Sequence, residues 1–169
     1  MNNKSKDYIS AALFAAVISI SAQVVIPLPS GLPLTLQTLA VCLCGYLLKP
    51  KYSLMSVSTY LLLGLFGAPV FSYFGGGPAV LFGKNGGFLL GFIFIALLCS
   101  ISRHKNRIVK IILGFTGILF CHIIGVIQFS LVFGMPIISA FLIVSLPTLL
   151  KDMVCVFISI FISEKLKFN

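Results

Sequence analysis

Three long segments without a single charged residue constrain this chain more than any other feature. They run from Tyr8 to Leu48, from Tyr52 to Gly83 and from Ile111 to Leu150. Hydrophobic residues make up 59% of the 169 residues and charged residues only 9%, whereas a soluble domain carries about 25% charged residues. Because so few charges do not cover the surface of a water-soluble protein of this size, the composition excludes a soluble enzyme and a disordered chain.

The apolar segments predict an all-α integral membrane protein that forms a single domain, residues 1–169. A membrane-spanning helix needs about 20 mostly apolar residues, and the chain supplies enough of them for five or six spans. We expect six transmembrane helices joined by long, apolar outer loops. The helices are expected at residues 8–26, 35–48, 52–68, 86–102, 108–132 and 137–163.

The basic residues form short clusters between these helices. The clusters are Lys4/Lys6, Lys49/Lys51, Arg103/Lys105/Arg107/Lys110 and Lys165/Lys167. If the N-terminus is cytoplasmic, every cluster falls on the cytoplasmic side, as the positive-inside rule requires. We therefore interpret the net charge of +9 as a topology signal, with contacts to anionic lipid or cytoplasmic partners as a secondary role, and we expect no nucleic acid partner.

The N-terminal segment resembles a signal peptide, because Lys4 and Lys6 precede an apolar run. That run continues to Ile26 and is longer than a usual signal-peptide core. We expect the segment to be retained as the first span, so that both termini are cytoplasmic in a multi-pass protein of the cell membrane.

The outer connections, residues 26–35 and 68–87, are long, apolar and rich in glycine and proline. Irregular backbone at membrane depth is tolerated only where protein or a water-filled cavity satisfies it. The helix expected at 35–48 is about 21 Å long, which is too short for a hydrocarbon core of about 30 Å. A short helix beneath infolded loops predicts a binding pocket open to the outer side, and a poorly ordered apolar loop is the alternative.

Two adjacent charges, Lys151 and Asp152, lie inside the last expected helix. Charges within a span are costly and usually functional, so we interpret both as ligand-site residues, with an internal ion pair as the alternative. Gln37 and Thr38 add hydrogen-bonding groups at the start of the second helix.

Two more polar residues, His122 and Gln128, lie in the helix expected at 108–132. Their spacing of six residues places them on different faces of the helix. We expect His122 to be a neutral, packed histidine. For Gln128, helix–helix hydrogen bonding and pocket lining remain equally open.

No motif for catalysis, metal binding or nucleotide binding is present in the sequence. Gly83-Lys84-Asn85 lacks the Ser or Thr that follows lysine in a phosphate-binding loop, and Asp7 and Glu164 lie at cytoplasmic ends. The five cysteines are scattered without metal spacing and are interpreted as small apolar residues. We therefore expect no enzyme, no metal and no bound cofactor.

Small residues four positions apart recur in two of the expected helices. The steps are Ala11/Ala15 and Ala12/Ala16 in the first helix and Gly87/Gly91 in the fourth. This spacing lets two helices approach closely. It serves either internal packing or docking to another membrane protein.

Three stretches together carry a resemblance to a known family. Residues 34–41 read Leu-Thr-Leu-Gln-Thr-Leu-Ala-Val, residues 60–71 read Tyr-Leu-Leu-Leu-Gly-Leu-Phe-Gly-Ala-Pro-Val-Phe, and the glycines 75–77 precede a glycine-rich stretch, 83–92. They resemble, in order, the signature after the first outer loop, the end of the third helix, and the following loop with the fourth helix of the BioY family. Members of this family are biotin-specific substrate-binding (S) components of energy-coupling factor (ECF) vitamin transporters.

The resemblance implies a mechanism for the chain. The S component binds biotin from outside in a loop-covered pocket and docks, partly through the alanine steps Ala11/Ala15 and Ala12/Ala16, onto a membrane scaffold (T) subunit. That scaffold bears two cytoplasmic ATPase subunits, and ATP hydrolysis there topples the S component and releases biotin inside the cell. The lack of a nucleotide motif agrees with ATP being used only by the partner subunits.

The chemistry of biotin selects candidate contacts. Its ureido ring offers two N–H donors and one carbonyl acceptor, and its valerate carboxylate needs a cation or several donors. The candidates for the ureido ring are Asp152, Asn85 and Gln37. The candidates for the carboxylate are Lys151, Lys84 and Thr35. The apolar walls are expected from Tyr60, Phe71, Tyr73 and Phe74.

The last helix departs from the family pattern, Pro-x-Asp-x-x-Lys. Here Pro147 is followed by Thr-Leu-Leu and then Lys151 and Asp152. Adjacent helical residues point about 100° apart, so the two charges do not both occupy the family geometry. Either the helix shifts its register or only one of the two side chains lines the pocket.

Two other functions remain open. An S component for thiamin or riboflavin would favour stacking residues such as tryptophan, and the chain has none. An autonomous transporter usually needs internal repeats and ion-site acids, and neither is evident.

Overall fold

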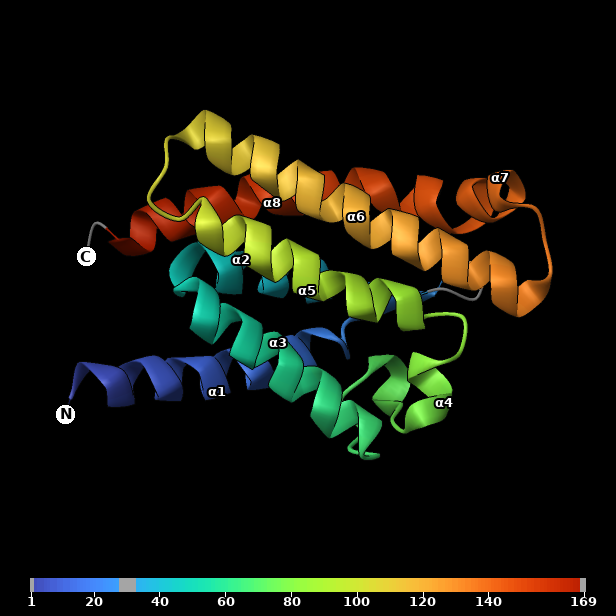
Figure 1. The fold of residues 1–169 in the computed structure, drawn as a ribbon, viewed down its shortest axis with the longest axis horizontal. Coiled ribbons are helices and arrows are strands. Elements are labelled where there is room, and N and C mark those ends of the chain that lie inside the picture. The colour runs from blue at the N-terminus through green and yellow to red at the C-terminus, as the bar shows by residue number, and fades with distance from the viewer. Residues whose placement is uncertain (1, 28–32, 168–169) are drawn as a thin grey trace.

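The computed structural model describes residues 2–27 and 33–167, which form a bundle of helices (Figure 1). Its longer helices are α1 (Asn3–Ser21), α2 (Gln37–Leu47), α3 (Pro50–Leu65), α5 (Gly86–Ile101), α6 (Arg107–Phe133) and α8 (Leu146–Lys167). The shorter elements are strands β1 (Val25–Pro27) and β2 (Pro33–Thr35), a 3-10 turn η1 (Ser72–Phe74), helices α4 (Pro78–Leu81) and α7 (Ile137–Ala140), and a π turn η2 (Phe141–Ser145). Each of the six segments predicted to be helical contains a helix.

The first predicted helix, 8–26, is wrong at both ends. Helix α1 begins at Asn3 and ends at Ser21, and residues 25–27 form strand β1. This strand pairs antiparallel with β2, so that Val25 lies opposite Thr35. The run of β-branched residues before Pro27 favours extended backbone.

The last predicted helix, 137–163, is interrupted in the structure. It consists of α7, the π turn η2 and α8, which extends to Lys167. Pro147 has no N–H to donate to the carbonyl four residues earlier, which belongs to Ile143 inside the π turn. The proline therefore explains why the backbone departs from α-helical geometry at this point.

Helices α5 and α6 pack closely because small residues lie at their contact. Gly87 faces the carbonyl of Ile124, and a Cβ placed on Gly91 would lie only 2.5 Å from Cys121 Cα. A larger side chain would force the two helices apart. The glycine step of α5 therefore serves internal packing, one of the two roles left open by the sequence.

The bundle buries small polar side chains and exposes large apolar ones. Buried serine hydroxyls donate to carbonyls of neighbouring helices, a common device between membrane helices. The bonds run from Ser53 to Ala96 at 3.3 Å, from Ser56 to Ala11 at 2.9 Å and from Ser159 to Leu39 at 3.2 Å. The exposed side chains include Leu119, Ile123, Leu131, Phe157 and Phe161. Such a surface suits lipid rather than water, as expected of a membrane protein.

Two helical segments of the described ranges are long and apolar enough to cross a membrane. They are α6, with 27 residues, and the segment Ile137–Leu166, with 30 residues. Helices α2 and α5 are apolar but shorter. The shortness predicted for the second helix is thus present in α2, which has 11 residues.

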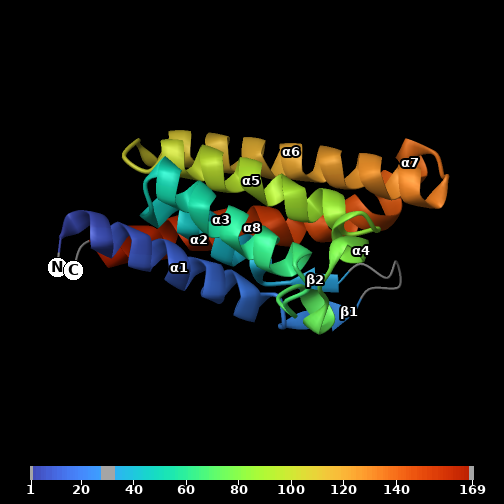
Figure 2. The same ribbon diagram turned by 60° about the horizontal axis from the view of Figure 1, so that its bottom comes forward.

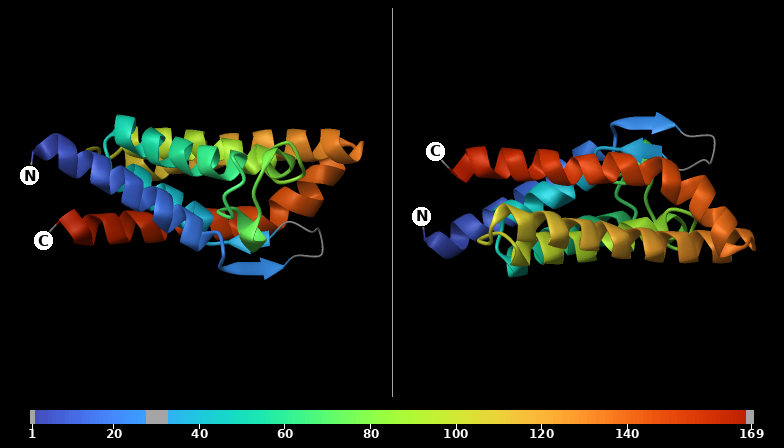
Figure 3. Two further views of the ribbon diagram at one scale, coloured as in Figure 1. Left: turned by 90° about the horizontal axis from the view of Figure 1, so that it is seen from below. Right: turned by 90° about the horizontal axis from the view of Figure 1, so that it is seen from above.

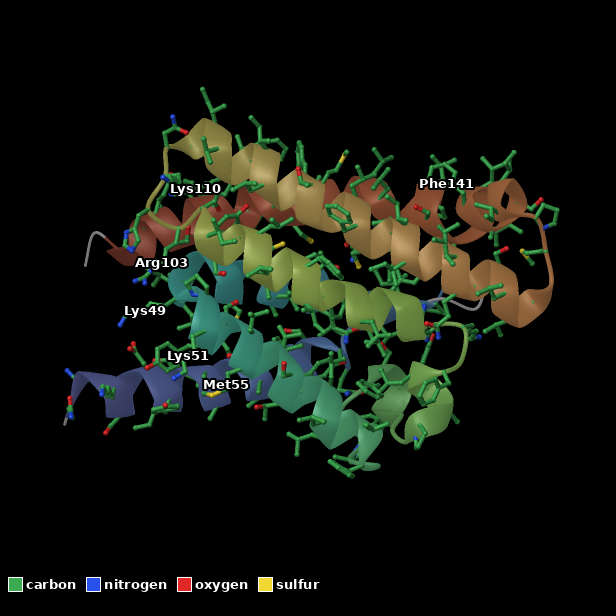
Figure 4. The ribbon with its side chains drawn as sticks, viewed as in Figure 1. Lys49, Lys51, Met55, Arg103, Lys110 and Phe141 are labelled. Carbon is green, nitrogen blue, oxygen red and sulfur yellow. The ribbon has the colours of Figure 1, made fainter. Side chains whose placement is uncertain are left out.

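The bundle has two different ends. Both chain termini lie at one end, while the β1–β2 hairpin and α4 lie toward the other (Figure 2, Figure 3). Lys49, Lys51, Arg103 and Lys110 gather at the end that holds the termini (Figure 4). These four basic residues therefore lie at the opposite end from β1, β2 and α4, as the charge pattern predicted for the basic clusters.

Candidate functional site

A pocket lies between strand β2, the loops around η1 and α4, and helices α2, α5, α6 and α8. Helix α2 begins shortly after β2, and α5 begins shortly after α4, so the first turns of both helices meet under the loops. The lining residues are Pro33, Thr35, Gln37, Thr38, Phe71, Ser72, Val80, Asn85, Phe88, Leu89, Phe92, Cys121, Thr148, Lys151 and Asp152.

The charged wall of the pocket is formed by two adjacent residues of α8. Lys151 Nζ lies 2.5 Å from Asp152 Oδ1 and donates a hydrogen bond of 2.9 Å to the Thr35 carbonyl. The flexible stem of the lysine brings its ammonium group back to the neighbouring carboxylate, although the two Cα–Cβ bonds diverge. The π turn before α8 also changes the register of the helix.

Both charges therefore line the pocket. Of the two alternatives posed by the sequence, a single lining residue does not describe the structure. The ion pair and the ligand-site interpretation do not exclude each other, because Lys151 and Asp152 form a pair within the pocket wall.

His122 of α6 lies behind Asp152. Its Nε2 is 3.1 Å from Asp152 Oδ2, and its Nδ1 is 2.7 Å from the Ser145 hydroxyl. The edge of the Phe88 ring packs against the imidazole, with centroids 5.5 Å apart. The histidine is buried, as a packed residue should be, but the sequence did not predict that it contacts a pocket carboxylate.

A second polar group is centred on Gln37. Its Oε1 accepts hydrogen bonds from Thr35 Oγ1 at 2.8 Å and Ser72 Oγ at 3.3 Å, and its Nε2 donates to the Tyr60 hydroxyl at 2.5 Å. Tyr60 is fully buried and packs edge-on against Phe71, with ring centroids 5.4 Å apart. Tyr60 thus fixes the Gln37 amide and the Phe71 ring from behind the pocket wall.

Two acceptor oxygens are buried in the pocket wall. Asn85 Oδ1, just before α5, has no hydrogen-bond donor among the described residues, and Asp152 Oδ1 is paired with the Lys151 ammonium group at 2.5 Å. A buried acceptor without a donor costs about 1–3 kcal/mol. N–H groups of a ligand placed at these oxygens would therefore be bound favourably.

Two glutamines fasten the loops beside the pocket. Gln23, after α1, donates to the Phe71 carbonyl at 3.1 Å. Gln128 of α6 donates to the carbonyls of Leu81 and Gly83, both at 2.8 Å. Gln128 thus ties α6 to the last residue of α4 and to Gly83 after it. This contact agrees with the helix–helix hydrogen bonding left open by the sequence, and Gln128 is not in the pocket lining.

The structure brings most of the predicted site residues together. Those that line the pocket are Thr35, Gln37, Phe71, Asn85, Lys151 and Asp152. Tyr60 supports the wall from behind, and Lys84 is outside the lining. Tyr73 and Phe74, predicted as walls, are 59% and 72% exposed. Their φ angles of 61° and 54° form a tight left-handed turn that leaves both rings on the surface.

The apolar pocket residues that α5 contributes were not predicted from the sequence. Phe88, Leu89 and Phe92 follow Asn85 at spacings of three, four and seven residues, and this spacing places all four on one helical face. The periodicity was available in the sequence, but an apolar residue within an apolar helix carries no signal of its own.

The alanine steps of α1 divide between two faces. Ala11 and Ala15 are 1% and 3% exposed, and the Ala11 carbonyl accepts a hydrogen bond from Ser56 of α3. Ala12 and Ala16 lie on the exposed face. The prediction that all four form a docking surface is therefore wrong for Ala11 and Ala15, because α1 uses them to pack within the bundle.

No metal centre is evident in residues 2–27 and 33–167. These ranges contain no cluster of three or more His, Cys, Asp or Glu side chains that could hold an ion. The five cysteines are free and buried: Cys42 and Cys44 lie in α2, and Cys99, Cys121 and Cys155 lie in α5, α6 and α8.

Residues 1–168 match the sequence model of the BioY family. The chain is 32% identical over 166 residues to a probable biotin transporter BioY of Pyrococcus horikoshii, covering 98% of this chain and 99% of that protein. It is 42% identical over 102 residues to the biotin transporter BioY of Thermotoga maritima, covering 60% of each. A crystal structure of the S-component for biotin from an ECF-type ABC transporter matches with a TM-score of 0.88 and 28% identity, covering 100% of this chain and 95% of that one.

Proposed function

The chain belongs to the BioY family, and we propose that it captures biotin outside the cell as the substrate-binding component of an ATP-driven ECF transporter. The fold shared with a biotin S-component supports this proposal. So does the pocket, which combines aromatic walls with a few polar groups, as small-molecule sites usually do.

The observation that carries the proposal is the pair of acceptors in the pocket wall, the donor-free Asn85 Oδ1 and the Asp152 carboxylate. The ureido ring of biotin has two N–H donors, which match these acceptors. Lys151 supplies a cation for the valerate carboxylate, and Thr38 adds a hydroxyl 3.5 Å from its ammonium group. Phe71 and Phe92 offer apolar surface for the bicycle.

In the topology that we propose, six segments cross the membrane: α1, α2, α3, α5, α6 and the α7–η2–α8 segment. The end that holds both termini and the basic residues faces the cytoplasm (Figure 4), in agreement with the positive-inside rule. The short helix α2 then leaves room for the pocket beneath the hairpin on the outer side.

The partners that we propose are a membrane scaffold (T) subunit and two cytoplasmic ATPase subunits. The exposed side of α1 with Ala12 and Ala16 supports docking of the scaffold, because small residues allow a second helix to approach closely. ATP is hydrolysed by the partner subunits, and this chain binds and carries biotin without chemical change.

Calorimetric titration of the detergent-purified protein tests the ligand. We expect about one biotin bound per chain and no heat from thiamin or riboflavin. A folded sample that takes up thiamin or riboflavin instead of biotin would identify an S component for another vitamin. Co-purification tests the partners, since an autonomous transporter would bring neither scaffold nor ATPases.

A further inference from the structure

A chain of three buried polar side chains runs from the π turn η2 to the pocket. The Ser145 hydroxyl lies 2.7 Å from His122 Nδ1, and His122 Nε2 lies 3.1 Å from Asp152 Oδ2. Ser145, His122 and Asp152 are 0%, 3% and 7% exposed. The three residues come from two helical segments, so the chain forms only when α6 packs against α8.

The chemistry of the groups fixes the direction of these hydrogen bonds. A carboxylate only accepts, so His122 Nε2 must carry the proton that points at Asp152. In the neutral ring Nδ1 is then an acceptor, and Ser145 donates its hydroxyl proton to it. The serine therefore selects the tautomer that the carboxylate needs, in the way that outer partners orient histidines in other polar sites.

The two oxygens of Asp152 have different neighbours. Oδ2 is held by His122, whereas Oδ1 is paired with the Lys151 ammonium group at 2.5 Å. His122 itself is not among the residues that line the pocket. On another side the imidazole borders an apolar cavity of about 410 Å³ between α6 and the α7–η2 segment, which includes Ile123 and Phe141. Apart from Ser145 and His122, the described residues that line this cavity are apolar.

We propose that His122 is a positioning residue for ligand binding, which holds the Asp152 carboxylate so that Oδ1 faces the ligand. This inference rests on the proposed function, because the ligand N–H donors are those of the biotin ureido ring. Without the His122 donor, the carboxylate rotates and both oxygens turn to the Lys151 cation. The pocket then loses the fixed acceptor while keeping all its lining residues.

Substitutions at position 122 separate positioning from packing. His122→Phe keeps an aromatic ring against Phe88 but removes the donor, and we expect biotin affinity to fall at least tenfold. His122→Gln places an amide N–H where Nε2 was, and we expect it to recover most of the affinity. Ser145→Ala should cost about threefold, while Ser163→Ala, an equally buried serine bonded to a helix carbonyl, serves as the matched control and should cost nothing.

A double-mutant cycle tests whether His122 acts through Asp152. If it does, His122→Phe combined with Asp152→Ala weakens binding little more than Asp152→Ala alone, since coupled residues are not additive. Biotin methyl ester should lose the same factor as biotin on His122→Phe, because the valerate end is not involved. All samples are compared by calorimetry after thermal unfolding confirms the same fold.

The outcomes separate the two proposals. If the wild-type protein binds no biotin, the proposed function fails. If the wild type binds biotin but His122→Phe binds equally well, the positioning role is overturned. Equal losses in the Phe and Gln variants, or additive losses in the double mutant, also contradict it, because they indicate packing alone.

Discussion

Replacing the Asp152 carboxylate by an amide provides the most direct test of the pocket chemistry. Asp152→Asn keeps the size of the side chain and an oxygen that can accept from His122, which lies 3.1 Å from Oδ2. It removes the negative charge 2.5 Å from Lys151 Nζ. The variant therefore changes the strength of the acceptor and leaves the shape of the pocket nearly unchanged.

The expected magnitude follows from the kind of hydrogen bond that is weakened. A hydrogen bond to a charged group contributes about 1.5–3 kcal/mol, and one between neutral groups about 0.5–1.5 kcal/mol. The difference is about 1–1.5 kcal/mol, and about 1.4 kcal/mol corresponds to a tenfold change in Kd. We expect Asp152→Asn to weaken biotin binding at least tenfold, and Lys151→Ala to do the same by removing the cation for the valerate group.

Calorimetric titration measures this effect, with Asp7→Asn as the matched control. Asp7 pairs with Lys49 at 2.7 Å near the termini, far from the pocket lining, and exposed pairs contribute little. The control should bind biotin with wild-type affinity. Wild-type affinity in both Asp152→Asn and Lys151→Ala would refute the assignment of these residues to the ligand.

Three further changes probe other parts of the molecule. Gly91→Leu should lower the free energy of unfolding by about 1–3 kcal/mol, because the new side chain meets the Cys121 backbone. Thermal unfolding in detergent measures this change, and an unchanged midpoint would contradict the close packing of α5 on α6. Gln128→Leu removes the hydrogen bonds to the Leu81 and Gly83 carbonyls beside the pocket and should weaken biotin binding about tenfold in a calorimetric titration. A wild-type Kd would mean that the pocket does not depend on these two hydrogen bonds. Ala12→Trp should abolish co-purification with the scaffold subunit and leave biotin binding intact. The control Leu119→Trp, on the exposed side of α6, should keep both the complex and biotin binding. If the complex survives in the Ala12→Trp variant, α1 is not part of the docking surface.

The sequence alone determined where the helices lie and which end carries positive charge. Both follow from local composition, because an apolar run without charges has to be buried in lipid or protein wherever it occurs. It also identified Gln37, Thr38, Lys151 and Asp152 as polar groups inside the membrane, and the structure gathers all four around one pocket. The notable exceptions were aromatic rings, since an aromatic residue in a loop, such as Tyr73, packs inward or outward without changing the pattern.

Only the tertiary structure decided which groups touch one another. Ala11 is buried and Ala12 is exposed because one side of α1 packs against α3. The four-residue spacing of small residues is the same on both sides of the helix, so the sequence does not show which side packs. The contact between His122 and Asp152 joins residues 30 positions apart, and it exists because α6 packs against a helix whose register follows a π turn. Periodicity describes the surroundings of a residue along one helix, whereas a hydrogen bond between helices depends on their packing and rotation, which no local pattern specifies.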